Sequence, residues 1–515
     1  MITSTYSKNK QFVINLIASI TTFLVGMGIS FLLTPYIVGD LGAAAYGFVG
    51  LSTNIIDYTT LITIALNSMA GRFITICYTQ GKIDEANEYF SSVFYSNLIL
   101  ATLILIAMGC CVFYLERIFE IPSNLIVDVK ILFSLLSLNS VIGLLTNIFA
   151  IATFVKNRIE LSSLRQIISR VIQALSIILL FCFMPAHVWY VGLAGMLAAI
   201  YTAYCNYRYT LILTPELKLS IDNFNISKVK ELLRSGFWNT FNKLGIILGQ
   251  GLDLVIANLY IGATAMGVFS ISRQIPFIII SFCSTISSVF APTLTHLYAK
   301  DDSEQFKNEI NKAIRLLGFF VTIPLSFLYI FGEDFFELWM PNQDSSMLYL
   351  LSVLCGLELS LSMPLEVLWN IFTVTNKLKI SSIFMFCNHL LTFLIVLISM
   401  YFIDNITIKL IILASTRTIL GIIRSLTFLP IYGARCINAP WFSFFAPLIK
   451  SLVSTSIISL ILYFVHQEIN HYTWTSLIYI VLFTLIVSVI INCFIILTKN
   501  DRVYISQKLL RLIKN

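Results

Sequence analysis

The stretch Leu41-Gly-Ala-Ala-Ala-Tyr-Gly-Phe-Val-Gly-Leu-Ser52 occurs twice in this chain. Its second copy, 220 residues later, is Ile261-Gly-Ala-Thr-Ala-Met-Gly-Val-Phe-Ser-Ile-Ser272. The same spacing pairs further identical residues downstream, as far as Tyr78 and Tyr298. A repeat at fixed spacing indicates a duplicated structural unit. Because both copies lie between long apolar segments, the sequence predicts a duplicated membrane protein whose functional site lies between the duplicates.

The composition excludes an ordinary soluble domain. Hydrophobic residues make up 58% of the chain and charged residues only 11%, whereas soluble domains carry about 25% charged residues. The net charge of +7 comes from basic loops, so nucleic acid is not an expected partner. The ten cysteines are scattered and the five histidines do not cluster, so neither a disulfide framework nor a metal site is expected.

Hydrophobic runs predict an all-α polytopic membrane protein with about fourteen transmembrane helices, each long enough for the roughly 20 residues that cross a bilayer. The first run is too long for a signal peptide and lacks a cleavage pattern, so we expect a retained span. The predicted spans are 12–38, 46–78, 90–115, 124–155, 161–184, 188–213, 231–258, 266–298, 312–331, 346–374, 378–403, 407–432, 442–465 and 472–497. They define an N-terminal lobe (1–213), a cytoplasmic linker (214–230), a C-terminal lobe (231–435), a pair of trailing helices (436–498) and a basic cytoplasmic tail (499–515).

Lysine and arginine residues are concentrated in alternate connections, with Arg117 and Lys409 as exceptions. The positive-inside rule therefore places both termini in the cytoplasm. An even number of predicted spans per lobe gives both lobes the same orientation, so we expect a parallel repeat about an axis along the membrane normal. The tail 499–515 alternates basic and apolar residues, which fits either an amphipathic surface helix or a solvated tail.

Ionisable residues inside the predicted spans are the candidate functional residues, since each costs at least about 2.5–3.5 kcal/mol at the centre of a membrane helix. Arg273 also lies just before Pro276, which leaves the Ser272 carbonyl without its helical hydrogen bond. The candidate substrate-binding cations are Lys243, Arg273, Arg417 and Arg170. The candidate ion-coupling carboxylates or counter-charges are Asp57, Asp253, Glu358 and Glu366.

Each of these groups has an alternative interpretation, an intramembrane ion pair that only holds helices together. Near mid-membrane the cations outnumber the acidic groups, which favours an anionic ligand, and arginine suits phosphate oxygens. Spacing on a continuous helix places Arg417 with Arg424 on one face, and Glu358 with Glu366 on another. Four basic residues near span ends are interpreted as snorkelling to the membrane surface: Arg424, Arg165, Lys130 and Arg72.

The stretch Leu33-Thr-Pro-Tyr-Ile-Val-Gly-Asp-Leu-Gly42, followed by Ala45-Tyr-Gly47, resembles the first helical hairpin of Wzx-type oligosaccharide-lipid flippases. These O-antigen and capsule exporters belong to the multidrug/oligosaccharidyl-lipid/polysaccharide (MOP) superfamily. The segments Gln80–Asn87 and Lys300–Gln305 are similar to that family's cytoplasmic linker. The resemblance implies a cationic cavity between two lobes, lined by the first, second, seventh and eighth spans, that takes the diphosphate and sugars while the polyprenyl tail stays in lipid. First-span charge, a mark of lipid II flippases, is absent.

We therefore expect a non-enzymatic flippase in the bacterial inner (plasma) membrane that moves undecaprenyl-diphosphate-linked oligosaccharide repeat units by alternating access, for O-antigen, lipopolysaccharide or capsule biosynthesis. No cofactor is expected, and coupling to H⁺ or Na⁺ stays open. Expected partners are the polyprenyl-diphosphate-linked oligosaccharide and the lipid bilayer, with a polysaccharide polymerase and a chain-length regulator as further candidates. The alternative is a cation-coupled multidrug or small-molecule antiporter of the same superfamily, with Asp57 or Glu358 as the coupling site. Short loops disfavour a membrane glycosyltransferase.

Overall fold

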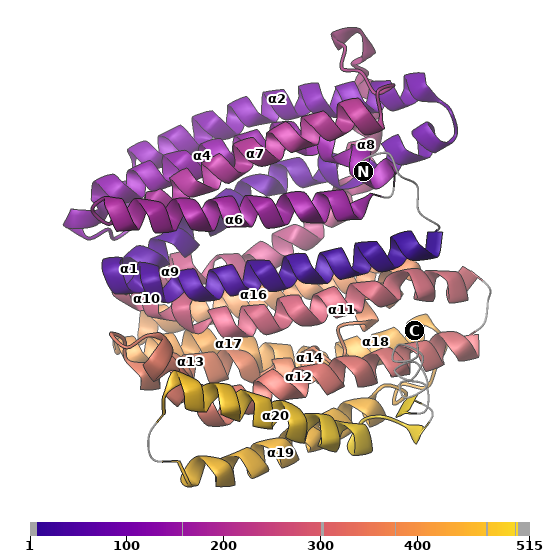
Figure 1. Cartoon of the computed structure of the whole chain (residues 1–515). Coiled ribbons are helices and arrows are strands. Elements are labelled where there is room, and N and C mark those ends of the chain that lie inside the picture. Colours follow the sequence, from indigo (N-terminus) through magenta and orange to yellow (C-terminus); the bar gives the residue numbers. More distant parts are fainter. Residues whose placement is uncertain are drawn as a thin grey trace. The chain divides into compact units, whose positions relative to one another are not determined.

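The computed structural model describes residues 8–156, 158–299, 303–375, 377–469, 472–499 and 501–502, and all regular structure in these residues is helical (Figure 1). The chain forms two compact units, Met1–Gly267 and Val268–Asn515. The first unit contains α1 Lys8–Thr79, α2 Ile83–Phe113, α3 Leu115–Ile118, η1 Ser123–Leu125, α4 Ile126–Asn147, η2 Ile148–Ala150, α5 Ile151–Val155, α6 Ile159–Phe183, α7 Tyr190–Leu213, η3 Ile221–Asn223, α8 Ile226–Ile246, the π-helical turn η4 Ile247–Gly251 and α9 Asp253–Tyr260.

Helix α10 Ala263–Ser272 passes from the first unit into the second. The second unit continues with α11 Gln274–Ala299, α12 Ser303–Trp339, α13 Ser345–Leu357, α14 Leu359–Ser362, α15 Leu368–Val374, α16 Leu378–Phe402, α17 Ile406–Leu426, α18 Phe428–Cys436, α19 Phe445–Gln467 and α20 Trp474–Ile495.

In the first unit, α1 packs against α2, α6 and α8, and α7 packs against α4 and α6 (Figure 1). The contact between α1 and α8 is very close at Gly236. A Cβ atom at this glycine would lie 1.9 Å from the carbonyl oxygen of Ala65. Small residues let membrane helices approach in this way, so Gly236 fixes the position of α8 against the second part of α1.

Each copy of the repeat bends the chain at its first glycine. Helix α1 is kinked at Gly42, where φ is 83°, and Gly262 separates α9 from α10 with φ of 119°. Residues other than glycine rarely adopt such φ values. The two copies also meet, because a Cβ atom at Gly267 would lie 2.0 Å from the Ala43 carbonyl oxygen. The two copies therefore form equivalent turns, and their small residues allow a close contact between the helices.

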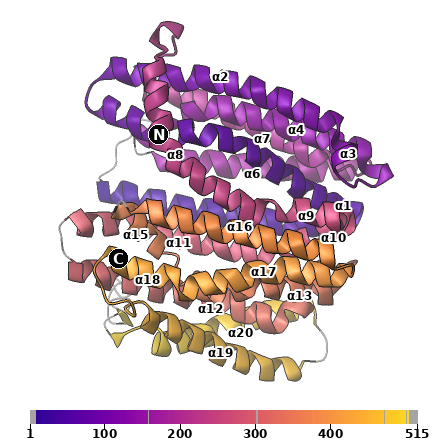
Figure 2. The same cartoon turned by 180° about the vertical axis from the view of Figure 1, so that it is seen from behind.

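In the second unit, α12 packs against α11, α13, α19 and α20, while α17 packs against α13, α16 and α18 (Figure 2). A buried apolar cluster holds the last two helices on α12. It consists of Phe331, Ile458, Leu462, Leu477 and Ile480. Helices α19 and α20 are therefore an integral part of this unit.

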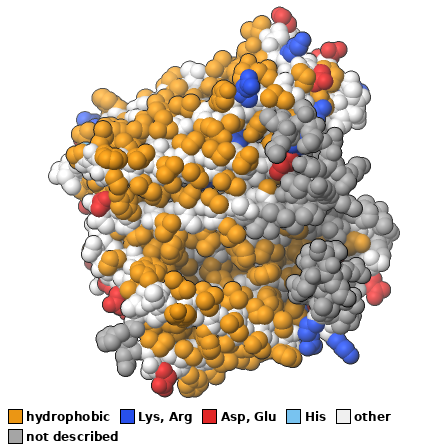
Figure 3. All heavy atoms as spheres, viewed as in Figure 1, with side chains coloured by type: hydrophobic (Ala, Val, Ile, Leu, Met, Phe, Trp, Pro, Cys, Tyr) orange, Lys and Arg blue, Asp and Glu red, His pale blue; other side chains and the backbone are white. Residues whose placement is uncertain are grey.

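The outward faces of the helices are apolar, as expected where lipid is the solvent. Figure 3 shows hydrophobic side chains covering much of the visible face, with most charged side chains near its margins. Phe183, Tyr401 and Phe402 are among the most exposed large side chains. In the described residues, 12 helical segments are long and apolar enough to cross a membrane. The chain is thus an all-α, multi-pass membrane protein, as predicted, whereas the count of about fourteen spans and their orientation stay predictions.

Several predicted spans are divided in the structure, and one division bears on two candidate residues. The segment 346–374 divides into α13, α14 and α15, with turns at Glu358 and at residues 363–367. Pro364 lies in the second turn and has no N–H to donate to a helical ladder. The eight-residue spacing of Glu358 and Glu366 therefore does not establish a shared helix face. Residues 503–515, most of the predicted tail, lie outside the described residues.

Candidate functional site

The clearest candidate site in the first unit is an ion pair between α1 and α8. The Nζ atom of Lys243 lies 3.9 Å from Oδ2 of Asp57, and the two side chains are 26% and 55% exposed. This separation is longer than a hydrogen bond. The pair is therefore loose and accessible. It also shows that the N-terminal lobe supplies the carboxylate that faces Lys243.

A π-helical turn lies one turn beyond Lys243. The hydroxyl of Tyr58 donates to the carbonyl oxygen of Gly251 at 2.6 Å, and the Asn54 amide donates to the same oxygen at 3.0 Å. Both donors come from α1. Turns of this kind occur often at functional sites because they leave backbone groups to be satisfied from outside the helix. Sequence reasoning missed Asn54 and Tyr58, although the glycines at 245, 249 and 251 mark the irregular backbone.

Arg273 separates α10 from α11. It directly follows Ser272, whose carbonyl Pro276 leaves without a helical hydrogen bond. Its guanidinium lies 5.3 Å from the ring centroid of Phe269, within the range of a cation–π contact. The side chain is partly buried in the second unit. Lys243, the other candidate cation discussed above, belongs to the first unit.

The remaining candidates lie in contrasting environments. Arg170 on α6 is exposed, and its Nη1 donates to Gln173 at 3.3 Å. Arg417 is partly buried on α17, which is continuous through Arg424. Asp253 is buried at the start of α9.

Two of the arginines interpreted as snorkelling instead bind partners inside the protein, with Arg165 buried and Arg424 largely buried, and that interpretation is wrong for them. Arg424 forms an ion pair and hydrogen bond with Glu358, with the two side chains 12% and 11% exposed. Gly421 makes room for the carboxylate, since a Cβ atom there would lie 2.0 Å from Glu358 Oε2. Arg165 is buried against Asn206 and Ser162. Interior hydrogen-bond partners, invisible in a linear sequence, hold both guanidinium groups inside.

The other two end residues are more accessible. Lys130 forms a half-exposed ion pair with Glu116, and Arg72 is exposed.

Glu366 accepts a hydrogen bond from the Ser284 hydroxyl at 3.0 Å. Glu358 and Glu366 therefore bind different partners.

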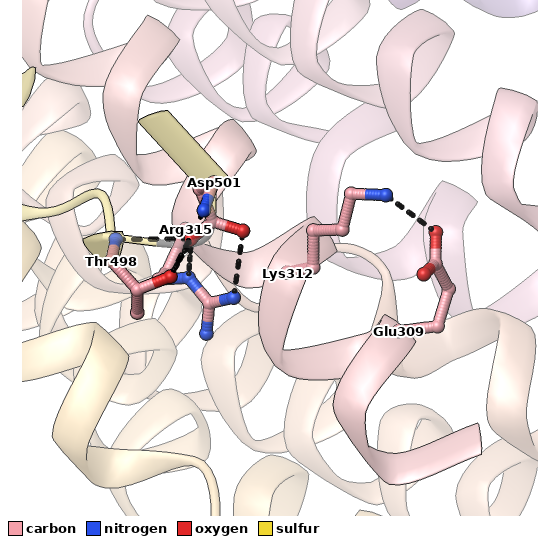
Figure 4. A network of polar contacts seen from close by, with 5 residues as sticks. All are labelled: Glu309, Lys312, Arg315, Thr498 and Asp501. Carbon is pink, nitrogen blue, oxygen red and sulfur yellow. Dashed lines mark hydrogen bonds and ion pairs between the residues drawn. The ribbon is translucent and has the colours of Figure 1, made fainter. Parts of the chain in front are cut away.

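Two pockets open at one end of the second unit. The larger, about 500 Å³, is lined by paired charges, with Arg315 donating to Asp501 and Lys312 donating to Glu309 (Figure 4). The smaller, about 390 Å³, is lined by Lys377, Lys379, Ile380, Tyr432, Arg435 and Cys436. No carboxylate is among the lining residues of the smaller pocket in the part of the chain that the structure describes. Its three side-chain charges are all positive.

Comparison with known sequences identifies the family. Residues 12–298 match the family model described as polysaccharide biosynthesis protein. The membrane protein EpsK of Bacillus subtilis (strain 168) is 33% identical over 365 residues, which cover 70% of this chain and 72% of that protein.

Comparison with solved structures identifies the fold. The lipid II flippase MurJ in an inward closed conformation matches with a TM-score of 0.65 and 15% identity, over 93% of this chain and 98% of that chain. An inward-facing multidrug resistance MATE transporter of the MOP superfamily matches with a TM-score of 0.60 and 16% identity, over 81% of this chain and 94% of that chain. The chain therefore belongs to the polysaccharide biosynthesis protein family and has the fold of MOP-superfamily transporters.

Proposed function

We propose that this protein is a flippase of the Wzx type that moves a polyprenyl-diphosphate-linked oligosaccharide from the cytoplasmic to the outer leaflet of the inner membrane. Membership of a polysaccharide biosynthesis family supports the substrate class. The fold shared with MurJ and MATE transporters supports alternating access between two lobes. The transported lipid then feeds O-antigen or capsule assembly, and no covalent bond changes during transport.

The observation that carries the proposal is the loose pair of Lys243 and Asp57. An ammonium group has three donors, and at 3.9 Å the Asp57 carboxylate makes no short hydrogen bond to it. A diphosphate can therefore take over Lys243 without breaking a buried interaction. We assign Arg273 as the second diphosphate ligand, while Arg170 and Arg417 add to the positive field. Asp57, Asp253 and Glu366 are proposed as counter-charges or as ion-coupling carboxylates.

The test is complementation of a strain that lacks the gene, with surface polysaccharide as the readout. Charge-assisted hydrogen bonds contribute roughly 1.5–3 kcal/mol, so Lys243→Ala should lower transport about tenfold to a hundredfold. Lys243→Arg should retain part of the activity because it keeps the charge. Lys230→Ala is the matched control, since Lys230 is an exposed lysine of the same helix. Membrane levels of each variant are measured in parallel.

Two outcomes would contradict this function. Normal polysaccharide in both Lys243→Ala and Arg273→Ala would exclude these residues as diphosphate ligands. Normal polysaccharide in the deletion strain, together with new sensitivity to cationic dyes, would favour a multidrug antiporter instead.

A further inference from the structure

A second, shorter repeat contributes Lys377, Lys379 and Ile380 to the lining of the smaller, cationic pocket. Val155-Lys-Asn-Arg-Ile-Glu-Leu-Ser-Ser163 is matched 219 residues later by Val374-Thr-Asn-Lys-Leu-Lys-Ile-Ser-Ser382. The backbone is similar at the residue that precedes the following helix in each copy. The N–H of Arg158 donates to Thr153 at 2.7 Å and that of Lys377 to Phe372 at 2.9 Å. Their φ values are −105° and −106°, and a long helix begins at the next residue of each. Arg158 and Lys377 are thus structurally equivalent.

The charges of these equivalent loops differ. In the first unit, Glu160 lies in the first turn of α6 and forms an ion pair with Arg158. A second carboxylate lies nearby, because Glu216 accepts a hydrogen bond from Tyr78, whose ring is 4.7 Å from the Lys156 ammonium. The first loop is therefore electrostatically balanced by its own residues.

In the second unit, Lys379 occupies the position that is equivalent to Glu160. It lies in the first turn of α16, where the described residues provide no acidic group and no side-chain cap. The Lys377 ammonium donates to the Cys436 carbonyl at 2.9 Å, which holds it at the pocket, and Arg435 is exposed on the same lining. The second loop thus has a base where the first has an acid, and its charge is concentrated and positive.

We propose that this pocket binds the phosphate of an anionic phospholipid headgroup. Arginine and lysine together with a helix N-terminus form a suitable environment for a phosphate. Basic pockets between membrane helices at their cytoplasmic ends are typical of lipid headgroup sites, and the predicted orientation places this end in the cytoplasm. Ile380 lines the same pocket and is exposed, so it offers an apolar surface to the acyl chains. None of the lining residues is a proposed diphosphate ligand, and the proposal does not depend on which lipid is transported.

The decisive variant is Lys379→Glu, because it recreates the balanced pair of the first unit. The full-length protein is purified, and retention of palmitoyl-oleoyl phosphatidylglycerol is measured by native mass spectrometry against the phosphatidylcholine of the same chains. Each basic residue near a membrane surface adds about fivefold to anionic lipid binding. The affinity for phosphatidylglycerol should therefore fall about tenfold or more in Lys379→Glu, and about fivefold in Arg435→Gln. The exposed Lys230→Glu is the charge-matched control and should bind like the wild type.

Three results would overturn the proposal. One is equal retention of phosphatidylglycerol by the wild type and by Lys379→Glu, when both proteins are monodisperse and equally heat-stable. Another is retention of phosphatidylcholine by the wild type that equals its retention of phosphatidylglycerol, which would show that the net charge of the lipid plays no role. The last is displacement of phosphatidylglycerol from this pocket by a lower concentration of undecaprenyl diphosphate, which would assign the pocket to a polyprenyl lipid instead.

Discussion

Two ion pairs between helices in the described residues differ in how tightly they are closed. Arg424 and Glu358 are both largely buried and hydrogen-bonded to each other. The Glu358 carboxylate occupies the space that a Cβ atom at Gly421 would need. Lys243 and Asp57 are partly exposed and 3.9 Å apart. A closed pair resists any exchange of partners, whereas an open pair can release its cation to another anion. Geometry therefore assigns a structural role to the first pair and a ligand-exchange role to the second.

The largest expected effect comes from breaking the closed pair. Removing one partner of a buried ion pair leaves the other charge uncompensated, which costs about 3–5 kcal/mol. Arg424→Ala should therefore lower the midpoint of thermal unfolding strongly and reduce the amount of protein in the membrane. The double variant Arg424→Met with Glu358→Leu should regain most of the loss, because an apolar replacement leaves no unpaired charge. A single variant as stable as the wild type would contradict a structural role.

Overpacking at the contact that positions the open pair should have a smaller effect. Gly236→Val forces a side chain against the Ala65 carbonyl, and extra atoms in a packed interface cost about 1–3 kcal/mol. Displacement of α8 should also weaken transport, since Lys243 lies on the same helix. Gly109→Val is the control, because a Cβ atom at Gly109 meets nothing within 4 Å. Similar unfolding midpoints for both variants would show that Gly236 does not fix α8.

The difference between the pairs could not be predicted from the chain alone. Hydrophobic runs and the repeat are sufficient to predict the helical membrane fold and a break in the helix between residues 38 and 46, since both depend on local sequence. The partner of a charged residue depends on contacts between distant helices. Arg424 looked like a snorkelling residue because it lies near a span end, but Glu358, 66 residues earlier, holds it inside. Likewise, sequence order did not reveal that Asp57 faces Lys243.

A third pair, between Arg315 and Asp501, extends the comparison to the end of the described chain. Arg315 donates through Nε at 2.7 Å and Nη2 at 3.2 Å, and Thr498 also donates to this carboxylate (Figure 4). Burial alone would raise the pKa of Asp501, but the hydrogen bonds from Arg315 and Thr498 outweigh it and lower the pKa below its ordinary value. The stabilisation is therefore complete above the unfolded pKa of about 3.9 and is lost as pH falls through the lowered value.

Asp501→Asn should reproduce this loss at neutral pH. Charged hydrogen bonds contribute roughly 1.5–3 kcal/mol, so we expect a local destabilisation of about 1–2 kcal/mol, less than for Arg424→Ala. Hydrogen exchange at the amides of Thr498 and Asp501 measures it directly, since both amides bond within this turn. Lys499→Gln, which changes an exposed neighbour, should leave the exchange unchanged. Unaltered protection in Asp501→Asn would mean that the pair does not hold this segment.

The smallest effect on stability is expected at the open pair, and this is where the comparison is tested most sharply. Partly exposed ion pairs contribute about 0–1 kcal/mol, so Asp57→Asn should leave the unfolding midpoint almost unchanged. The same change removes the anion that competes with a diphosphate for Lys243. Undecaprenyl diphosphate should therefore bind more tightly to the purified variant, while transport slows because release loses its competitor. A destabilisation as large as that of Arg424→Ala, with unaltered lipid binding, would make both pairs structural and remove the distinction between them.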